Sequence, residues 1–378
     1  MQPIDLDHNA TTRPHDEVLE AVARAQRDAY GNPGSRHALG RRARQVLENA
    51  RERIAGILNA APDEVIFTSG GTESINLALH GLAAGPPGAI ALPPGEHPAT
   101  EETVRALQQR GWRRAEIPID ADGRLVADQL ESLPWDEIRI VATLLAHNET
   151  GVIQDVAPLA HICRERRTPL HIDAVQAVGK IDVDFQSLGA TTLALAAHKF
   201  HGPRGIGALL VRNGVKLAPM TFGGHQETGL RPGTECAALA AGMATALQLW
   251  HDERAARTRF VTRLRDQLAE GLAAECSPIV IHGSAGQRLP NTLSVAFPGC
   301  DGDALLVALD LAGVCCSMGS ACASGSSEPA PILVAMGVPP EQSRCTLRFS
   351  LGVDNTPEEM TRAVRTIARI VAQLRNQG

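Results

Sequence analysis

Aromatic residues are scarce in this chain, and long apolar runs are missing from it. Phenylalanine, tyrosine and tryptophan make up 3% of its 378 residues, so leucine, isoleucine, valine and alanine must build most of the core. A membrane-spanning helix needs about 18 or more consecutive apolar residues, and no such stretch occurs. Residues 1–14 have neither a basic flank nor an apolar segment, so we expect no signal peptide.

The eight cysteines lack the spacings that metal sites and disulfide frameworks require. No CxxC pair occurs among them, so we expect neither a zinc nor an iron–sulfur site. A chain of this length does not need disulfides, which predicts free thiols and a reducing, cytoplasmic setting. The net charge of −6 is modest for this length and gives no reason to expect nucleic acid or anionic lipid as a partner.

Short apolar runs alternate with amphipathic segments over the first two thirds of the sequence. This alternation predicts an α/β fold whose central sheet is mostly parallel and covered by helices on both faces. The runs expected to form strands are 64–68, 89–93, 138–146, 169–174, 191–197 and 205–212.

A long alanine-rich helix is expected from about 236 to 275, and the pattern changes after it. Short strands and helices follow, which predicts a smaller α+β domain with an antiparallel sheet. We therefore expect two domains. Residues 15–255 form the large one, and residues 1–14 with 256–378 form the small one.

Lys199 lies in AHKFHGPRG, directly after an apolar run and before glycines and a proline. Desolvation at such a tight turn lowers the pKa of an amine and frees its lone pair for Schiff-base chemistry. Upstream, SGGTES (69–74) lies between a predicted strand and a predicted helix, where backbone N–H groups bind anions. Taken alone, that motif is better explained by a tight turn without a ligand, since it matches neither the Walker A nor the GxGxxG pattern.

Five polar groups each follow a predicted strand. The carboxyl ends of strands form the ligand crevice of an open α/β sheet, so these groups should meet at one edge. Alone, Asp173 is explained by a helix cap or an ion pair, and His97 by ordinary loop hydrogen bonds. The five residues are Thr72, His97, Asn148, Asp173 and Lys199.

Two further residues are candidates for chemistry near the C-terminus. Cys322 lies in MGSACASGSS, where small residues predict a mobile loop and an accessible thiol. Cys315 and Cys316 lie in an apolar segment and are expected to be buried packing residues. Arg348 lies in a predicted strand and needs an anion, either a substrate carboxylate held bidentately or a structural ion pair.

Motifs spread over nearly the whole chain resemble the cysteine desulfurases, which belong to the class V, fold-type I aminotransferase group. HPAT, HKFHGP and GGHQE are most similar to the nitrogen-fixation, NifS-like branch. The loop at about 317–330 fits the branch that includes NifS-like and IscS-like enzymes. The motifs are DHNATTRP (7–14), YGNPGSRH (30–37), EVIFTSGGTES (64–74), EHPAT (96–100), HNETG (147–151), HIDAVQAVGK (171–180), AHKFHGPRGIG (197–207), GGHQETGLRPGTE (223–235), GSACASGS (319–326) and LRFSLG (347–352).

The resemblance implies pyridoxal 5′-phosphate as cofactor and assigns residues to it. Lys199 would bind it covalently as a Schiff base, and His97 would stack on its ring. Asp173 would pair with the ring nitrogen, and Gln176 would hydrogen-bond the ring hydroxyl. The phosphate would be held by Gly71, Thr72 and His198, and by Thr234 from the other subunit of a homodimer.

The implied activity removes sulfur from L-cysteine and gives L-alanine. Lys199, His97 and Cys322 would carry the catalysis, with a persulfide formed on Cys322. Asn148 and Arg348 would hold the substrate carboxylate, with Asn148 also beside the cofactor. A sulfur-acceptor or scaffold protein would receive the sulfur for iron–sulfur cluster assembly, nitrogenase included, or for other thiolation.

Three alternatives stay open at this point. A selenocysteine lyase or a transaminase shares the cofactor, and a transaminase does not need Cys322. A non-catalytic assembly scaffold would bind partners through the cysteine loop and hold no cofactor. A nucleotide-binding α/β protein would use SGGT, although the usual phosphate-binding patterns are missing.

Two positions depart from the family pattern. Ala196 stands where a serine often binds the cofactor phosphate, so one hydrogen bond worth about 0.5–1.5 kcal/mol is expected to be lost or replaced by water. We therefore expect weaker cofactor retention without loss of function. Met318 stands where serine is common, and nothing further follows from it.

Overall fold

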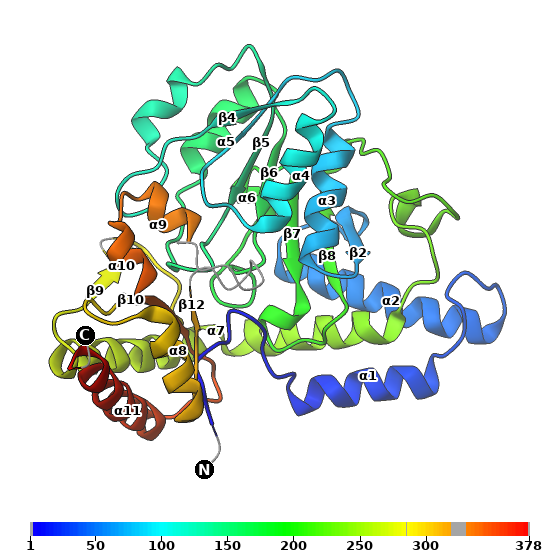
Figure 1. The fold of residues 1–378 in the computed structure, drawn as a ribbon. Coiled ribbons are helices and arrows are strands. Elements are labelled where there is room, and N and C mark those ends of the chain that lie inside the picture. Colours follow the sequence, from blue (N-terminus) through cyan, green and yellow to red (C-terminus); the bar gives the residue numbers. More distant parts are fainter. Residues whose placement is uncertain (1–2, 285, 319–329, 377–378) are drawn as a thin grey trace.

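A seven-stranded sheet forms the centre of the larger part of the molecule (Figure 1). The computed structural model describes residues 3–284, 286–318 and 330–376. The strand order is β2-β8-β7-β6-β5-β3-β4, and all pairs are parallel except those of β8 with β2 and β7. The mostly parallel sheet is confirmed. Its strands are β2 (Val65–Thr68), β3 (Ala89–Leu92), β4 (Arg113–Glu116), β5 (Ile138–Leu144), β6 (Leu170–Asp173), β7 (Thr192–Ala196) and β8 (Gly207–Val211).

Helices pack on both faces of this sheet, as the apolar strands require. In β7, Leu193 and Leu195 belong to one core cluster, whereas Ala194 between them belongs to another. This alternation with a period of two is how a strand serves two buried faces. The helices of this part are α1 (Asp16–Asp28), α2 (Ala38–Ile57), α3 (Gly71–Leu82), α4 (Pro98–Gln108), α5 (Ala157–Glu165) and α6 (Phe185–Leu188), with the first half of α7 (Ala237–Glu275).

The smaller part contains a four-stranded antiparallel sheet of order β12-β13-β10-β9. The expected antiparallel arrangement is confirmed. The N-terminus joins this part, because β1 (Ile4–Asp5) pairs with β11 (Val314–Cys315). The other elements are β9 (Val280–His282), β10 (Thr292–Ala296), β12 (Ser317–Met318), β13 (Thr346–Ser350), α8 (Gly302–Leu311), α9 (Pro331–Ala335), α10 (Pro340–Arg344) and α11 (Pro357–Arg375).

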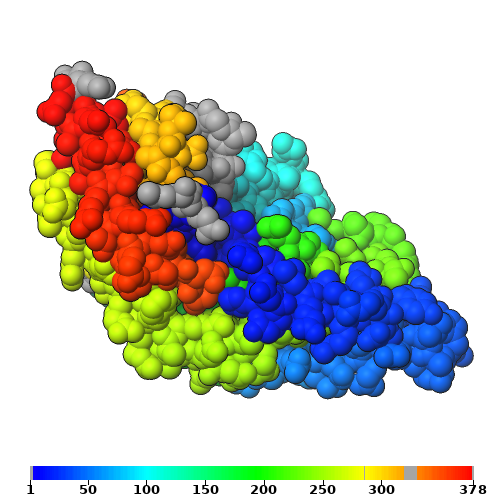
Figure 2. Space-filling model, turned by 90° about the horizontal axis from the view of Figure 1, so that it is seen from below, coloured from blue at the N-terminus to red at the C-terminus, as the bar shows by residue number. Residues whose placement is uncertain are grey.

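Helix α7 belongs to both parts of the molecule. Its buried residues up to Trp250 join the core around the seven-stranded sheet, and those from Val261 onward join the second core. In the view from below, α7 runs along both parts, and α1 and α11 pack against its two halves (Figure 2). We therefore propose that the domain boundary lies inside this helix, near residues 255 and 256.

Several elements differ from the sequence prediction. The strand at 205–212 is antiparallel, because the short connection after β7 does not allow a parallel crossover. Strands β9 and β12 were not predicted, because they have only three and two residues. The 3₁₀ helices are η1 (Pro62–Glu64), η2 (Ala127–Ser132), η3 (Ala197–Lys199) and η4 (Gln226–Gly229). Among the described helices, none is both long and apolar enough to cross a bilayer.

Buried histidines are expected to lower the stability of the fold at acidic pH. His171 in β6 is the residue with which we test this expectation. Its ring is fully buried against Thr192, and burial lowers its pKa from 6.5 to about 3. The unfolded chain therefore binds a proton that the folded chain excludes, and stability falls as the pH drops below about 6.5. We expect His171→Asn to reduce the slope of unfolding free energy against pH by up to about 1.4 kcal/mol per unit in denaturant titrations.

The exposed His161 offers a matched control for this measurement. His161→Asn removes a histidine without removing a buried ring. Equal slopes for His171→Asn and the unsubstituted protein between pH 4 and 6.5 would contradict the assigned cause.

Candidate active site

Five strands of the large sheet end at the same edge. The antiparallel strand β8 lies between β2 and β7, so β2 runs in the same direction as β7, β6, β5 and β3. Each is followed by a residue that the sequence singled out. The edge therefore receives Thr72 after β2, His97 after β3, Asn148 after β5, Asp173 at the end of β6 and Lys199 after β7.

Asp173, His97 and Lys199 form an electrostatic cluster at this edge. Asp173 is buried, and its Oδ1 accepts a hydrogen bond of 2.9 Å from the Val175 N–H. Burial raises the pKa of Asp173, while the nearby His97 and Lys199 lower it. A buried carboxylate in such a place is stabilised by a cation that can approach it.

The His97 ring is fixed by the start of a helix. It is the N-cap of α4, and its Nδ1 accepts a hydrogen bond of 3.0 Å from the Ala99 N–H. Burial lowers the pKa of His97, with Lys199 lowering it further and Asp173 raising it. The hydrogen bond assigns the ring proton to Nε2 in the neutral tautomer. His97 is therefore a flat, neutral ring beside a carboxylate and an amine.

Lys199 is bound by the N-terminal segment. Its Nζ donates to the main-chain oxygens of Asn9 (2.6 Å) and Ala10 (2.9 Å). The neighbouring His198 lies 3.2 Å from the Thr11 hydroxyl, and burial followed by the Lys199 charge lowers its pKa to about 4. The sequence predicted a tight apolar turn here. Buried alanines do flank the turn, but polar atoms from residues 9–11 complete it.

Asn9 connects the two parts of the molecule at the site. Its Nδ2 donates to the Asn148 oxygen and to the Thr292 hydroxyl, both at 2.9 Å. Its Oδ1 accepts from Asn291 at 3.0 Å, and its main-chain N–H donates to Ser350 at 2.8 Å. The sequence analysis gave Asn9 no role. Its DHNATTRP motif was the available signal, but no local periodicity reveals contacts with residues so far along the chain.

Gln176 and Lys180 meet at the same asparagine. The Gln176 Nε2 donates to the Asn9 main-chain oxygen at 2.9 Å. The Lys180 Nζ donates to the Asn9 Oδ1 at 2.7 Å and also to the Gln176 Oε1. Both residues are buried, and the sequence analysis did not single out Lys180.

Arg348 has the ion pairs that its burial required. It contacts Asp7 at 2.8 Å and Glu149 at 3.0 Å, and its Nη1 also reaches the Asn148 oxygen at 3.3 Å. Burial raises the pKa of Glu149 to about 7, although the Arg348 charge opposes that shift. The structural ion pair considered from the sequence is therefore present. Substrate binding by Arg348 and Asn148 stays a prediction.

The start of α3 provides a place for an anion. A Cβ built on Gly71 would lie 2.7 Å from the Val175 side chain, so the close approach of the backbone there requires glycine. Thr72 is exposed beside it. Ala196 at the end of β7 is fully buried and offers no hydroxyl. Gly71 thus lies close to Val175, two residues after the buried Asp173, and to Ala196, three residues before Lys199. A helix start, a buried carboxylate and a lysine fit the phosphate, ring nitrogen and aldehyde of pyridoxal phosphate.

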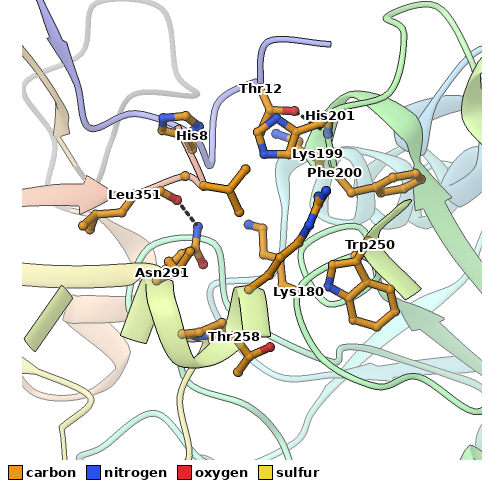
Figure 3. A pocket seen from close by; sticks show the side chains of 16 residues that line it. His8, Thr12, Lys180, Lys199, Phe200, His201, Trp250, Thr258, Asn291 and Leu351 are labelled. Carbon is orange, nitrogen blue, oxygen red and sulfur yellow. Dashed lines mark hydrogen bonds between the residues drawn. The ribbon is translucent and has the colours of Figure 1, made fainter. Parts of the chain in front are cut away.

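A small cavity of about 50 Å³ lies next to Lys199 (Figure 3). It is lined by Lys180 and Lys199, by His8 and His201, and by Asn291 from the smaller part of the molecule. The cavity therefore borders both lysines and both parts of the chain.

The other predicted residues lie away from this cluster or outside the described residues. Thr234 is exposed on the loop after η4, so its predicted contact with a second subunit stays a prediction. Cys322 lies outside the described residues. Cys315 and Cys316 are half-buried, and burial raises the pKa of Cys316 to about 12, which disfavours its reactive thiolate.

The sheet, the lysine after β7 and the buried aspartate define the class of fold-type I pyridoxal-phosphate enzymes. The sequence pattern of the family described as "Aminotransferase class-V" matches residues 4–362. The chain belongs to this family, whose members depend on pyridoxal phosphate.

Relatives and solved structures agree with this membership. The chain is 41% identical to the IscS-like cysteine desulfurase of Mycobacterium tuberculosis, over 98% of this chain and 96% of that protein. It is 38% identical to the cysteine desulfurase NifS of Azotobacter vinelandii, over 100% and 94%. A solved NifS-like protein is similar with a TM-score of 0.92 at 35% identity, covering 98% of this chain and 100% of that one. The structure described as "SspA in complex with cysteine" has a TM-score of 0.83 at 30% identity, covering 92% and 99%.

The Asn9 junction is tested by removing its side chain. Asn9→Ala leaves buried partners without hydrogen bonds, which costs about 1–3 kcal/mol for each group left unsatisfied. We expect the free energy of unfolding to fall by about 2–4 kcal/mol in urea titrations. Asn213→Ala removes an exposed amide contact and serves as the control, with an expected change within about 0.5 kcal/mol. A similar small change for Asn9→Ala would show that the junction contributes little to stability.

Proposed function

We propose that this chain is a cysteine desulfurase, which converts L-cysteine to L-alanine and transfers the sulfur to its own Cys322. The observation that carries the proposal is the cluster of buried Asp173 with half-buried His97 and Lys199 at one sheet edge, in a member of the class V family. Curated relatives at 34–41% identity bear the name cysteine desulfurase. A solved neighbour described as a complex with cysteine supports the substrate.

The residues at the sheet edge would hold pyridoxal phosphate. When bound, this cofactor supplies an electron sink for the bond-breaking steps at the substrate's carbons. Lys199 would hold it covalently, Asp173 would pair with its ring nitrogen, and His97 would stack on its ring. The Gln176 amide would donate to its ring hydroxyl. Phosphate binding would fall to the Gly71 backbone, Thr72, His198 and the partner subunit's Thr234.

The substrate would be oriented by its carboxylate and would exchange protons with Lys199. Asn148 and Arg348 lie side by side and would bind the carboxylate. Arg348 would then share or exchange its contacts with Asp7 and Glu149. Lys199, once released from the cofactor, would move the substrate's α-proton as a general base. His97 supports this role because its neutral ring adds no charge that would repel a protonated Lys199.

Sulfur transfer would proceed without an external oxidant. The Cys322 thiolate attacks the substrate sulfur, so an S–S bond forms as the substrate's C–S bond breaks. The electron pair of that bond stays with the carbon, which takes up a proton and leaves as part of alanine. The products are L-alanine and a persulfide on Cys322. The loop at about 317–330 would carry that sulfur to an acceptor.

We propose a homodimer in the cytoplasm that delivers sulfur to an acceptor or scaffold protein for iron–sulfur assembly, nitrogen fixation included. Exposed apolar side chains support a second copy, since Phe222 is 88% exposed just before the loop that carries Thr234. The free thiols of the described cysteines fit a reducing compartment.

The thiol assignment is tested with Cys322→Ser. We expect this variant to bind pyridoxal phosphate with unchanged affinity, form no persulfide and release no sulfide from L-cysteine. Mass spectrometry of the protein after substrate addition, together with a sulfide assay, measures both outcomes. Sulfide release at the native rate would reject Cys322 as the acceptor and favour a transaminase or another fold-type I reaction.

The lysine assignment is tested with Lys199→Ala. Because Lys199 would both hold the cofactor and move the proton, we expect alanine formation from L-cysteine to fall by at least about 100-fold. Lys216→Ala, at an exposed lysine, is the matched control. Normal turnover by the Lys199 variant would remove this residue from the mechanism.

The missing hydroxyl at position 196 predicts a substitution that should increase affinity for the cofactor. Ala196→Ser restores a donor for the phosphate, and we expect affinity for pyridoxal phosphate to rise about 2- to 12-fold in equilibrium titrations. Ala194→Ser on the same strand places the same hydroxyl in an apolar cluster and should give no gain. Equal affinities for Ala196→Ser and the unsubstituted protein would place the phosphate away from the end of β7.

A further inference from the structure

Lys180 is a buried amine to which the proposed chemistry assigns no task. The chain has three lysines among its 36 basic residues, and two of them, Lys180 and Lys199, donate to the same residue, Asn9. The third, Lys216, is exposed. An ammonium group directs its donors from a single atom, whereas a guanidinium spreads them over a plane. Two acceptors lie close to the single nitrogen of Lys180, and this arrangement suits a lysine better than an arginine.

The acceptors of Lys180 are neutral amide oxygens. Its Nζ donates to the Asn9 Oδ1 at 2.7 Å and to the Gln176 Oε1, and the residue is 8% exposed. Burial holds the pKa of Lys180 well below its usual value, and the charges of Lys199 and Arg348 lower it further. Burying this amine costs desolvation free energy, so we expect Lys180 to make a favourable contribution at the site.

Lys180 determines the orientation of the Gln176 amide. A glutamine amide can turn by 180° and exchange its oxygen with its nitrogen, but the protonated form of Lys180 has no acceptor to offer, and the Asn9 main-chain oxygen on the other side has no donor. The Gln176 oxygen must therefore face Lys180. The Nε2 then faces the other way, where it donates to the Asn9 main-chain oxygen at 2.9 Å. Its second hydrogen is the donor assigned above to the cofactor's ring hydroxyl.

We propose that Lys180 is a positioning residue for the cofactor, which acts by fixing the direction of the Gln176 amide. This inference rests on the proposed function, because it names the residue that orients one of the proposed cofactor ligands. In Figure 3, Lys180 projects toward the cavity that Lys199 and Asn291 also border.

A role through Gln176 is separated from simple filling of space by a double-mutant cycle. Lys180→Met keeps the length of the side chain and removes its donors. We expect it to raise the dissociation constant for pyridoxal phosphate about tenfold in titrations of cofactor-free protein, as for one charge-assisted hydrogen bond. In a Gln176→Ala background the same change should cost less than about twofold. Equal tenfold losses in both backgrounds would overturn the proposal.

Lys216→Met is the matched control for this cycle, since it removes an exposed lysine. Its dissociation constant should equal that of the unsubstituted protein, and a tenfold loss there would mean that the affinity responds to net charge alone.

A second experiment compares two variants of Gln176 and leaves Lys180 unchanged. It therefore tests the contact between the two residues even if Lys180→Met does not fold. Gln176→Glu and Gln176→Leu both remove the donor to Asn9, but only the glutamate keeps an oxygen for Lys180. We expect Gln176→Leu to melt several degrees below Gln176→Glu as cofactor-free protein, because it removes one of the two acceptors of the buried Lys180 amine. Equal melting temperatures would overturn the contact on which the proposal rests.

Borohydride reduction separates this proposal from the proposed function. With three lysines in the chain, peptide mapping assigns the reduced cofactor without ambiguity. Label on Lys199 supports both proposals. Label on Lys180 overturns the positioning role. No label on either rejects the proposed function, whereas the comparison of the Gln176 variants still decides whether Lys180 holds that amide.

Discussion

The hydrogen bonds of Asn9 are the constraint on which the site depends. A single buried side chain joins Asn148 at the edge of the large sheet to Thr292 in the smaller antiparallel sheet. Its main-chain oxygen accepts hydrogen bonds from the Lys199 amine and the Gln176 amide. Amide groups in a low-dielectric interior hold such positions strongly, because each unmade bond is expensive. The N-terminal segment therefore connects the two cores, with Ile4 and Leu6 packed in the core of the smaller part.

The part of the site that could be predicted from the sequence is the part that local patterns determine. Asp173, His97 and Lys199 each follow an apolar run, and the rule that parallel strands end at one edge brings them together. Asn9 and Lys180 could not be found in this way. Asn9 meets Thr292 from 283 positions away, and no periodicity links them. The antiparallel direction of β8 was missed for a related reason, since an apolar strand reads the same in either direction.

Charge is distributed unevenly between the two sides of the cluster. Arg348 lies between Asp7 and Glu149, so the side proposed to bind substrate contains two carboxylates with which a substrate carboxylate would have to compete for Arg348. Lys180, on the other side, is held by amide oxygens of Asn9 and Gln176. The first arrangement can exchange partners when an anion arrives. The second cannot do so without leaving a buried group unpaired, so it is suited to fixing geometry.

The loop that carries Thr234 is anchored by ion pairs at both ends, whereas Thr234 itself is exposed. Arg51 of α2 holds Glu227 at 2.7 Å, and Arg44 of the same helix holds Glu235 at 3.1 Å. Both glutamates are buried, so the two ends of the loop are attached to one rigid helix. Thr234 between them is exposed. A side chain presented outward by a loop fixed at both ends loses little conformational entropy on binding, which supports the proposal that Thr234 completes a site on a second copy of the chain.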